Sequence, residues 1–391
     1  MHVLVIPTWY PNGADKLIGI YHKEYCNALA NNGVKVNMLY VDRQKMSHPI
    51  KYLFMNKKEL IKESNYNIYM RKNFDIRRIS YSLSIKNYCK TLEKAFKDYI
   101  KANGMPDILH AQVTIPAGYA VCKLGEKYNI PVVVTEHATY YERFFNEENI
   151  KYSQYVLNHS YYTTVSKYMA DNILKKYKQC DVLPNLIDTD NFIMPRKKID
   201  GLKLITVVGL RRVKRVDDII EALKIIIEKK NIKNASLTVV GDGLDASYFK
   251  NRCHELNMDK YVTFVGKKTK EEIAKLLNKH NIYVMSSEIE TFGIPAIEAF
   301  ASGIPVVATK CLGPEEFVDN KSGKLISIGN IDEMVDAILS VYNNIDKYDI
   351  KYLRSIAKRY SGKSVTDKAI KIYKELLKDK KWYWWKKLYI I

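Results

Sequence analysis

The chain has 391 residues, which is too long for one ordinary hydrophobic core and fits two domains. Hydrophobic residues make up 47% of the sequence and charged residues 27%, so the chain can bury sizeable cores and is not disordered. The formal net charge of +20 predicts an anionic partner, such as nucleic acid, a membrane surface or a phosphorylated ligand. Composition alone does not choose among these three.

The six cysteines lie far apart, without a C-x-x-C pair or a nearby histidine at metal-ligand spacing. They are predicted to be reduced and mostly buried. The N-terminal stretch MHVLVIPTWYPNG runs from apolar residues directly into a turn and lacks the layout of an export signal. No window holds 18 uninterrupted apolar residues, so no transmembrane helix is expected. We therefore expect a cytoplasmic protein and leave contact with a membrane surface open.

Short Val- and Ile-rich runs alternate with longer amphipathic segments along the whole chain, which is typical of parallel sheets. The expected strands of the first half are residues 2–7, 34–41, 66–71, 107–111, 131–137, 161–166 and 180–185. Those of the second half are residues 202–209, 236–243, 261–266, 281–287, 304–309 and 323–328. A turn-rich, basic stretch at 183–201 separates the two sets. The pattern predicts an α/β fold of two facing, doubly wound, Rossmann-like domains, with a ligand cleft at the carboxyl ends of their strands.

The stretch ETFGIPAIEAFASGIPVVAT, residues 290–309, has a glutamate on each side of a turn between a strand and a short helix. The amides at the start of that helix can hold an anion. Glu298, about one turn into the helix, would repel a phosphate, so its expected partner is a neighbouring diol such as a ribose. Glu290 precedes the turn and is expected near a sugar. Alternatively, Glu290 is a solvated loop residue and Glu298 an acid favoured by the helix dipole.

A second turn, in VVGLRRVKRVDDIIEAL at residues 207–223, follows a strand and carries four cations. Four cations on one loop repel one another unless an anion joins them, and each is worth about 4 kcal/mol at 4 Å from a phosphate oxygen at an effective dielectric of about 20. A solvated basic turn is the alternative.

Together these motifs resemble the retaining glycosyltransferases of family 4, which have the GT-B fold. The resemblance rests on E-x7-E with an internal Phe-Gly, on EAFASGIPVVAT and on GPEEFV. The stretches VSKYM, LPNLIDTDNF, VVGDG, FVG and IPTWYPN extend it over nearly the whole chain, in family order and at family spacing.

The resemblance implies that Glu298 binds the ribose of a nucleotide sugar and that Glu290 contacts the donor sugar. The backbone amides of Phe292, Gly293 and Ile294 would bind the diphosphate. Lys214 and an arginine of the same turn would neutralise it. The commonest family pattern is G-R-x-x-x-x-K, whereas here Leu210 follows the glycine and one residue fewer precedes the lysine, so we choose Arg211 over Arg212.

In the first domain, the resemblance implies that Gly19 lets the backbone approach the diphosphate. Family members often have H-x-H after the fourth or fifth strand, but here the second position is Gln112 and only His110 remains. This puts a histidine-assisted step there in doubt. His137, at the tip of the next strand, matches a position that the family commonly keeps. The catalytic candidates are thus Arg211, Lys214, Glu290 and His137, and the donor-binding candidates are Gly19, Phe292, Gly293, Ile294 and Glu298.

The resemblance further implies an acceptor-side domain at 1–185, a nucleotide-sugar domain at 186–365 and a helix and tail at 366–391 that cross back to the first domain. The implied enzyme is a retaining, metal-independent glycosyltransferase that uses a UDP- or GDP-sugar and no cofactor. Asp188 and Asp190 form an Asp-x-Asp pair, but the family has the same turn without a metal. The alternatives are a GT-B sugar-nucleotide epimerase or phosphorylase, or a non-catalytic binder of anionic polymer.

Half of the net charge lies in residues 43–104, which contain 15 Lys or Arg and 5 Asp or Glu. Aromatic and aliphatic residues are interleaved with these cations, as suits a face lying on anionic headgroups. The tail KDKKWYWWKKLYII has the composition of an interfacial anchor. Alternatively, its tryptophans Trp382, Trp384 and Trp385 pack on the first domain and the basic face is solvated. We expect a peripheral protein whose acceptor is a lipid-linked or membrane glycan precursor, and no nucleic-acid partner.

Overall fold

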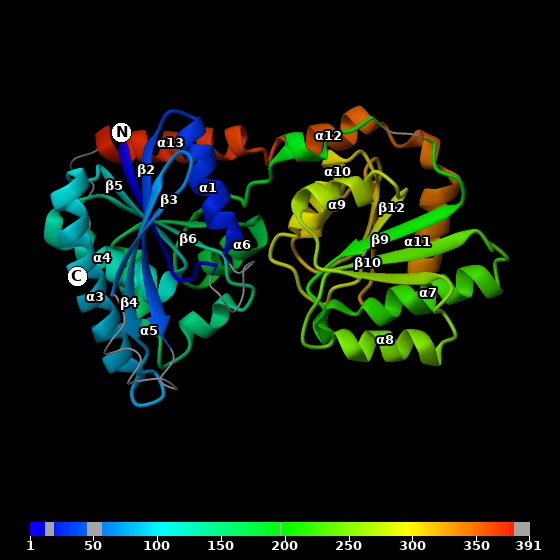
Figure 1. The fold of residues 1–391 in the computed structure, drawn as a ribbon, viewed down its shortest axis with the longest axis horizontal. Helices are drawn as coiled ribbons and strands as arrows, with labels where there is room; N and C mark the ends of the chain where they lie inside the picture. The colour runs from blue at the N-terminus through cyan, green and yellow to red at the C-terminus, as the bar shows by residue number, and fades with distance from the viewer. Residues whose placement is uncertain (12–18, 45–56, 196–197, 379–391) are drawn as a thin grey trace. The chain divides into compact units, whose positions relative to one another are not determined.

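The computed structural model describes residues 1–11, 19–44, 57–195 and 198–378. The chain forms two compact units (Figure 1). Unit 1 comprises Met1–Leu186 together with the segment that begins at Gly362, and unit 2 is Ile187–Ser361. The domain boundaries predicted from the sequence lie after residues 185 and 365. The tryptophan-rich tail at 379–391 and the cationic stretch at 45–56 lie outside the described residues.

Unit 1 is built on an eight-stranded sheet with the order β3-β4-β2-β1-β5-β6-β7-β8. Its strands are β1 (His2–Pro7), β2 (Lys35–Gln44), β3 (Lys58–Lys62), β4 (Asn67–Phe74), β5 (Ile108–Gln112), β6 (Val132–Glu136), β7 (Tyr161–Thr164) and β8 (Asp181–Val182). All neighbours pair in parallel except β3 and β4. Each residue of β1, β5 and β6 is buried, as in a parallel sheet covered on both faces.

The edge strand β3 was not among the expected strands. Its sequence KELIK is short and charged, and four of its five residues are exposed. Charged residues on an edge discourage pairing with other chains, so an edge strand of this kind lacks the apolar run used to find the others.

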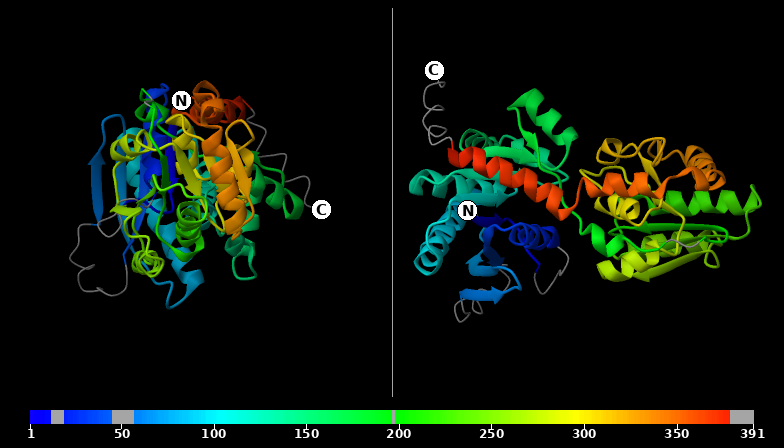
Figure 2. Two further views of the ribbon diagram at one scale, coloured as in Figure 1. Left: turned by 90° about the vertical axis from the view of Figure 1, so that its right-hand side faces the viewer. Right: turned by 90° about the horizontal axis from the view of Figure 1, so that it is seen from above.

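Helices of unit 1 surround its sheet, and one of them comes from the segment that follows unit 2. They are α1 (Ile20–Asn31), α3 (Tyr81–Asn103), α4 (Tyr119–Tyr128), α5 (Ile150–Asn158), α6 (Lys167–Lys176) and α13 (Gly362–Lys378). Figure 2 shows α13 in red beside α1 in blue, and the two helices are in contact. Five α13 side chains enter the unit 1 core: Val365, Ala369, Ile372, Tyr373 and Leu376. The C-terminal helix therefore completes the core of the first unit.

Unit 2 is built on a six-stranded, all-parallel sheet with the order β11-β10-β9-β12-β13-β14. Its strands are β9 (Leu202–Val207), β10 (Ala235–Val240), β11 (Val262–Gly266), β12 (Ile282–Met285), β13 (Val306–Thr309) and β14 (Gly323–Ile326). Its helices are α7 (Val216–Glu228), α8 (Ala246–Glu255), α9 (Lys270–Leu277), α10 (Ile294–Ala301), α11 (Ile331–Asn343) and α12 (Ile350–Lys358). Figure 1 shows α7 and α8 on one face of the sheet and α9 and α10 on the other.

In each sheet the strand order reverses beside the first strand of the unit. The reversal lies between β1 and β5 in unit 1 and between β9 and β12 in unit 2. Connections on the two sides of such a point leave toward opposite faces, which opens a crevice at the carboxyl ends of the strands. The predicted doubly wound architecture of both units is confirmed. Within the described ranges, no helix is long and apolar enough to cross a membrane.

Candidate active site

The two motifs of unit 2 meet at its reversal of strand order. The cationic turn follows β9 and forms a short 3-10 helix, Arg212–Lys214, while the loop with Glu290 follows β12. The Nζ atom of Lys214 lies 2.5 Å from Oε1 of Glu290, and each side chain is only about one-fifth exposed. Two residues that lie 76 positions apart thus form an ion pair where the fold predicts a ligand crevice.

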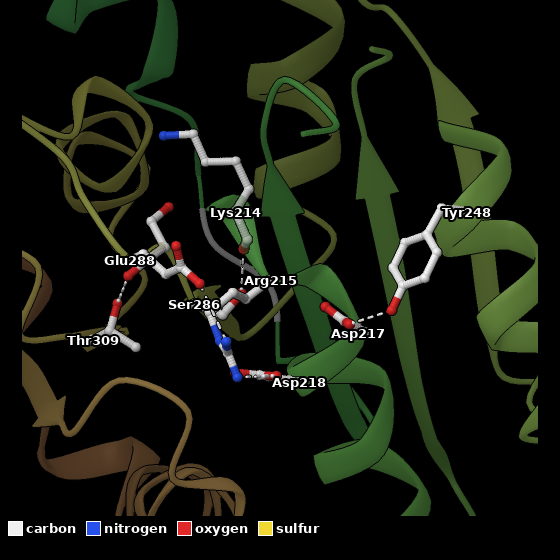
Figure 3. A network of polar contacts seen from close by, with 9 residues as sticks. Lys214, Arg215, Asp217, Asp218, Tyr248, Ser286, Glu288 and Thr309 are labelled. Atoms are coloured by element: carbon white, nitrogen blue, oxygen red, sulfur yellow. Dashed lines mark hydrogen bonds and ion pairs between the residues drawn. The ribbon is translucent and has the colours of Figure 1, made fainter. Parts of the chain in front are cut away.

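Backbone contacts hold the turn and the β12 loop together beneath this pair. Ser286 donates its hydroxyl to the carbonyl oxygen of Lys214 at 2.8 Å, and the Glu288 amide donates to the Val213 carbonyl at 2.8 Å. The hydroxyl of Thr309, at the end of β13, donates to the Ser287 carbonyl at 2.6 Å. These hydrogen bonds connect the ends of β9, β12 and β13, and they fix the backbone that carries the Lys214 side chain (Figure 3).

Arg215 joins the cationic turn to the start of α7 and to the loop that follows β12. Its guanidinium contacts both carboxylate oxygens of Asp218, at 2.7 and 3.1 Å, and Oε1 of Glu288 at 3.2 Å. These carboxylates raise the pKa of Arg215, and the largest cause is the hydrogen bond that its guanidinium donates to Asp218. In Figure 3 the Lys214 ammonium points away from the Arg215 guanidinium.

The two remaining arginines of the turn differ in their surroundings. The guanidinium carbon of Arg212 lies 3.3 Å from the centre of the Tyr248 ring, and its backbone amide donates to Asp245 at 3.0 Å. Tyr248 in turn donates its hydroxyl to Asp217 at 2.9 Å (Figure 3). Arg211 is exposed and has an extended backbone. Arg212 is therefore turned toward α8 by a cation–π contact. The choice of Arg211 as the phosphate candidate stays a prediction.

The turn before α10 is shaped for close approach of a ligand to the backbone. Gly293 caps the helix in the left-handed region, with φ at 91°, and no side chain of the described residues caps the helix. Phe292 is buried and its ring packs 5.2 Å from that of Tyr360. A Cβ at Gly313 would lie 2.5 Å from the Phe292 carbonyl oxygen, so only glycine fits there. The uncapped start of α10 leaves amides that suit an anion.

Glu298 lies in the second turn of α10 and is only 4% exposed. Its Oε1 is 3.5 Å from the Nζ atom of Lys270, at the start of α9. The alternative that Glu290 is a solvated loop residue does not hold, because its side chain is 20% exposed and paired with Lys214. The backbone of Glu290 is also fixed, because its amide donates to the Cys311 carbonyl at 2.8 Å and its carbonyl accepts from Gly313 at 2.7 Å.

The candidates of unit 1 gather at the other reversal of strand order. Gly19 caps α1 in the left-handed region, with φ at 72°, and a Cβ there would lie 2.9 Å from the Trp9 carbonyl oxygen. His137 follows β6 and is bonded through both ring nitrogens: Nδ1 lies 2.9 Å from Asn185 Oδ1, and Nε2 lies 2.5 Å from Gln112 Oε1. Gln112 thus occupies a structural position beside His137.

Burial lowers the pKa of His137 to about 3, so its ring is neutral at pH 7. A neutral imidazole has one donor and one acceptor, whereas both of its neighbours are assigned as amide oxygens. One of the two amides must therefore be turned so that its NH2 group donates to the ring. The ring is held on two sides, and at neutral pH it lacks the second proton that an imidazolium would give as an acid.

Three residues at these sites were not predicted from the sequence. Asn185 lies in the segment that follows β8, and His22 lies in the first turn of α1. Lys270 reaches Glu298 from α9. Asn185 falls in an expected strand and in a family stretch, neither of which indicates a partner for its side chain, and nothing in the spacing of His22 or Lys270 marks them. Within the described residues, no three His, Cys, Asp or Glu side chains gather as a metal site would require.

Two family profiles match the chain in succession. One, described as Glycosyltransferase Family 4, matches residues 18–191, and the other, described as Glycosyl transferases group 1, matches residues 189–357. The chain is 25% identical over 299 residues to an N-acetyl-alpha-D-glucosaminyl L-malate synthase of Bacillus anthracis, covering 70% of this chain and 76% of that protein. It is 26% identical over 266 residues to a poly(ribitol-phosphate) alpha-N-acetylglucosaminyltransferase of Staphylococcus aureus, covering 64% and 51%.

Solved structures share the fold. A sucrose-phosphate synthase from Thermosynechococcus elongatus superposes with a TM-score of 0.76 at 17% identity, over 97% of this chain and 100% of that one. HepE from Anabaena, solved with UDP, superposes with a TM-score of 0.71 at 16% identity, over 96% and 100%. The two profiles together leave only the ends of the chain unmatched, and the fold is shared with these solved structures. The protein therefore belongs to the GT-B glycosyltransferases of the family 4 type.

Proposed function

We propose that the protein transfers a sugar, with retention at the anomeric carbon and without a metal, from a UDP- or GDP-sugar to an acceptor hydroxyl. The observation that carries this proposal is the Lys214–Glu290 ion pair beside the uncapped start of α10. The pair offers a cation to a diphosphate and a carboxylate to sugar hydroxyls. The names of the two relatives, which specify alpha-linked N-acetylglucosamine, support retention. HepE, solved with UDP and with UDP-glucose, supports the class of donor.

The roles proposed for the residues that would bind the nucleotide sugar follow from their charges. Glycosyl transfer passes through a transition state that resembles an oxocarbenium ion, while negative charge grows on the leaving diphosphate. Lys214, Arg211 and the amides of Phe292, Gly293 and Ile294 would stabilise that charge. Glu298 would accept hydrogen bonds from the ribose hydroxyls, and Glu290 from the donor sugar. The leaving phosphate can take the acceptor proton on the same face, so the neutral ring of His137 is not needed as a base.

The first experiment measures release of free nucleoside diphosphate from a panel of UDP- and GDP-sugars, with and without candidate acceptor glycans. Release that depends on an acceptor and persists in EDTA is the expected result. Loss of activity in EDTA with recovery in magnesium would contradict metal independence. Interconversion of sugar nucleotides without an acceptor would indicate an epimerase, and phosphate-dependent cleavage of a glycan would indicate a phosphorylase.

Replacing Glu298 by Ala should raise the donor KM about a hundredfold, because charge-assisted hydrogen bonds to two ribose hydroxyls are worth about 1.5 to 3 kcal/mol each. Steady-state kinetics with varied donor measures the effect. Glu298→Gln keeps the shape and removes the charge, and Glu255→Ala, on the exposed side of α8, is the control. A donor KM that stays at the wild-type value would refute the ribose assignment.

Replacing Lys214 by Ala should lower kcat about a hundredfold as well as weaken donor binding, because charge on the diphosphate is larger in the transition state than in the ground state. The matched control is Arg212→Ala, which removes a cation of the same turn that stacks on Tyr248. Arg212→Ala should leave kcat within a few fold. If Lys214→Ala changed only KM, the lysine would bind the donor without acting in catalysis.

We further propose that the protein works at an anionic membrane surface on a lipid-linked or membrane glycan acceptor. The supporting observation is a stripe on α3, spaced three or four residues apart, in which every side chain is exposed: Leu83, Lys86, Lys90, Lys94, Lys97 and Lys101. Such spacing puts the side chains on one face of a helix. Just before the helix, Ile79 is 67% exposed beside the exposed Arg77 and Arg78. Apolar side chains among cations suit an interfacial surface.

Vesicle flotation tests this surface. The protein should float with vesicles that contain phosphatidylglycerol, but not with pure phosphatidylcholine, and high salt should release it, because each basic residue contributes about 1 kcal/mol at an anionic surface. A triple variant, Lys86→Glu, Lys90→Glu and Lys94→Glu, should abolish flotation. The charge-matched control is Lys229→Glu, Lys230→Glu and Lys250→Glu, on exposed positions of unit 2. Equal loss in both triple variants, or no flotation of the wild type at low salt, would contradict the proposal.

A further inference from the structure

A fully buried carboxyl group lies at the end of β6, directly before His137. Glu136 is 0% exposed, and its two oxygens accept four hydrogen bonds. Its Oε1 accepts from the backbone amide of His137 at 2.9 Å and from that of Ala138 at 2.7 Å. Its Oε2 accepts from the amide of Thr114 at 2.9 Å and from the Thr114 hydroxyl at 2.5 Å. One side chain thus holds both segments that follow β5 and β6.

The Thr114 hydroxyl extends this network to a third strand. It lies 2.5 Å from the hydroxyl of Tyr162, on β7, and both residues are buried. The Thr114 hydroxyl has one hydrogen, which it donates to Glu136, so the Tyr162 hydroxyl donates to Thr114. Glu136 is therefore the acceptor at which hydrogen bonds from β7 and from the segments after β5 and β6 converge.

The turn that Glu136 holds after β5 is strained. Val113 is fully buried and has a φ of 80°, which is unfavourable for a β-branched residue. Its amide donates to the Thr135 carbonyl at 2.8 Å, and its carbonyl accepts from the Gly118 amide at 3.0 Å. Residues kept in such conformations by the surrounding structure cluster at functional sites. Val113 directly follows Gln112, so the strain lies beside a residue of the candidate site.

A carboxyl group is an unfavourable choice for this position if only stability is considered. The groups that donate to Glu136 are three backbone amides and a hydroxyl, and none is a cation. Burial raises the pKa of Glu136, whereas its hydrogen bonds with Thr114, Ala138 and His137 act to lower it. Perturbed carboxyl groups of this kind are typical of functional sites. Because Glu136 is fully buried, it can serve a substrate only through the residues that it holds.

The residues that Glu136 holds meet at the candidate site of unit 1. The backbone of His137 is fixed by the hydrogen bond from its own amide to Glu136. Gln112 lies two residues before Thr114, whose amide and hydroxyl are bound on the other side of the same carboxyl group. The Nε2 atom of His137 lies 2.5 Å from Oε1 of Gln112. This contact therefore depends on two backbone segments that one carboxyl group fixes.

We propose that Glu136 is a positioning residue for the reaction: its hydrogen bonds fix the backbone of His137, the catalytic candidate of unit 1, and of the segment that follows Gln112. The inference rests on the proposed glycosyl transfer. Glu136 makes no contact with the substrate. Loss of its hydrogen bonds would displace His137 and Gln112 from the positions that the reaction requires.

Hydrogen exchange of the unliganded protein gives the first test and needs no sugar nucleotide. Glu136→Leu can accept no hydrogen bond, so peptides that cover residues 113–118 and 137–140 should take up deuterium faster than in the wild type. In Glu136→Gln the side-chain oxygen can still accept from the two amides that follow β6, while the NH2 group faces Thr114. Only residues 113–118 should then exchange faster.

Steady-state kinetics gives the second test. Glu136→Leu should lower kcat about a hundredfold, because a displacement of about 1 Å in an active site has an effect of this size. Donor KM should stay within a few fold, since most of the proposed donor-binding residues lie in unit 2. Glu136→Gln should keep kcat within about fivefold of the wild type, the worth of one hydrogen bond.

The matched control is Asn37→Leu, near the amino end of β2, whereas Glu136 lies at the carboxyl end of β6. Asn37 is also buried and also holds two segments. Its NH2 group donates to the Tyr99 hydroxyl at 3.0 Å, and its oxygen accepts from the Asn67 amide at 3.0 Å. Asn37→Leu should lower Tm as Glu136→Leu does, yet leave kcat within a few fold. This difference separates positioning from a loss of stability.

A double-mutant cycle tests whether Glu136 acts through His137. His137→Ala should lower kcat, and adding Glu136→Leu to it should cause no further loss. If the two losses multiplied, Glu136 would act independently of His137 and the proposal would be wrong. The proposal would also be overturned if Glu136→Gln lost as much activity as Glu136→Leu, because the charge, and not the hydrogen bonds to the backbone after β6, would then be required.

Failure of the proposed function is a separate outcome. The wild type would then release no nucleoside diphosphate from any donor, while the exchange of residues 137–140 could still be compared between the wild type and the variants. Unchanged exchange in Glu136→Leu would itself refute the proposal. Glu136→Gln retains the shape of the side chain and supplies both measurements if Glu136→Leu does not fold.

Discussion

The reversal of strand order beside the first strand of each sheet is the constraint on which the candidate sites depend. Two strands that pair in parallel must be joined by a crossover connection. Where the crossovers that follow two adjacent strands leave toward opposite faces of the sheet, neither connection covers the carboxyl ends of those strands. In unit 2 those strands are β9 and β12, and in unit 1 they are β1 and β5. Lys214 and Glu290 follow the first pair, while Gln112 ends β5. The chemistry is thus gathered by topology from segments far apart in the sequence.

Several charged side chains around the candidate site of unit 2 pair with one another. Glu290 pairs with Lys214, Glu298 lies near Lys270, and Arg215 is clamped by Asp218 and Glu288. The ion pairs differ in which parts of the structure they connect. Those of Arg215 join two loops and fix the backbone, whereas that between Lys214 and Glu290 joins only the ends of two side chains beside the reversal of strand order.

The sequence was sufficient to predict the architecture because buried parallel strands are continuous apolar runs, and each of the 13 expected runs overlaps an observed strand. The edge strand β3 was missed because its exposed, charged residues carry no such signal. Motifs on one loop, such as Glu290 to Glu298, could be found by spacing. Contacts between distant segments could not be found in this way, because they depend on three-dimensional packing. Examples are the ion pair of Lys214 with Glu290 and the hydrogen bond between Asn185 and His137. Another is the buried ring of His22, whose nitrogens have no hydrogen-bond partner among the described residues.

The C-terminal helix α13 has a consequence for how the chain is made. Unit 2 is one continuous segment, Ile187–Ser361, whereas unit 1 needs side chains from both ends of the chain. Tyr373 is fully buried there, with its hydroxyl 2.8 Å from that of Tyr25 and 2.6 Å from Nδ1 of His110. During synthesis, residues 1–186 therefore lack part of their core until α13 has left the ribosome. All of unit 2 is translated before α13, so the core of unit 1 is completed after the whole of unit 2 has been made.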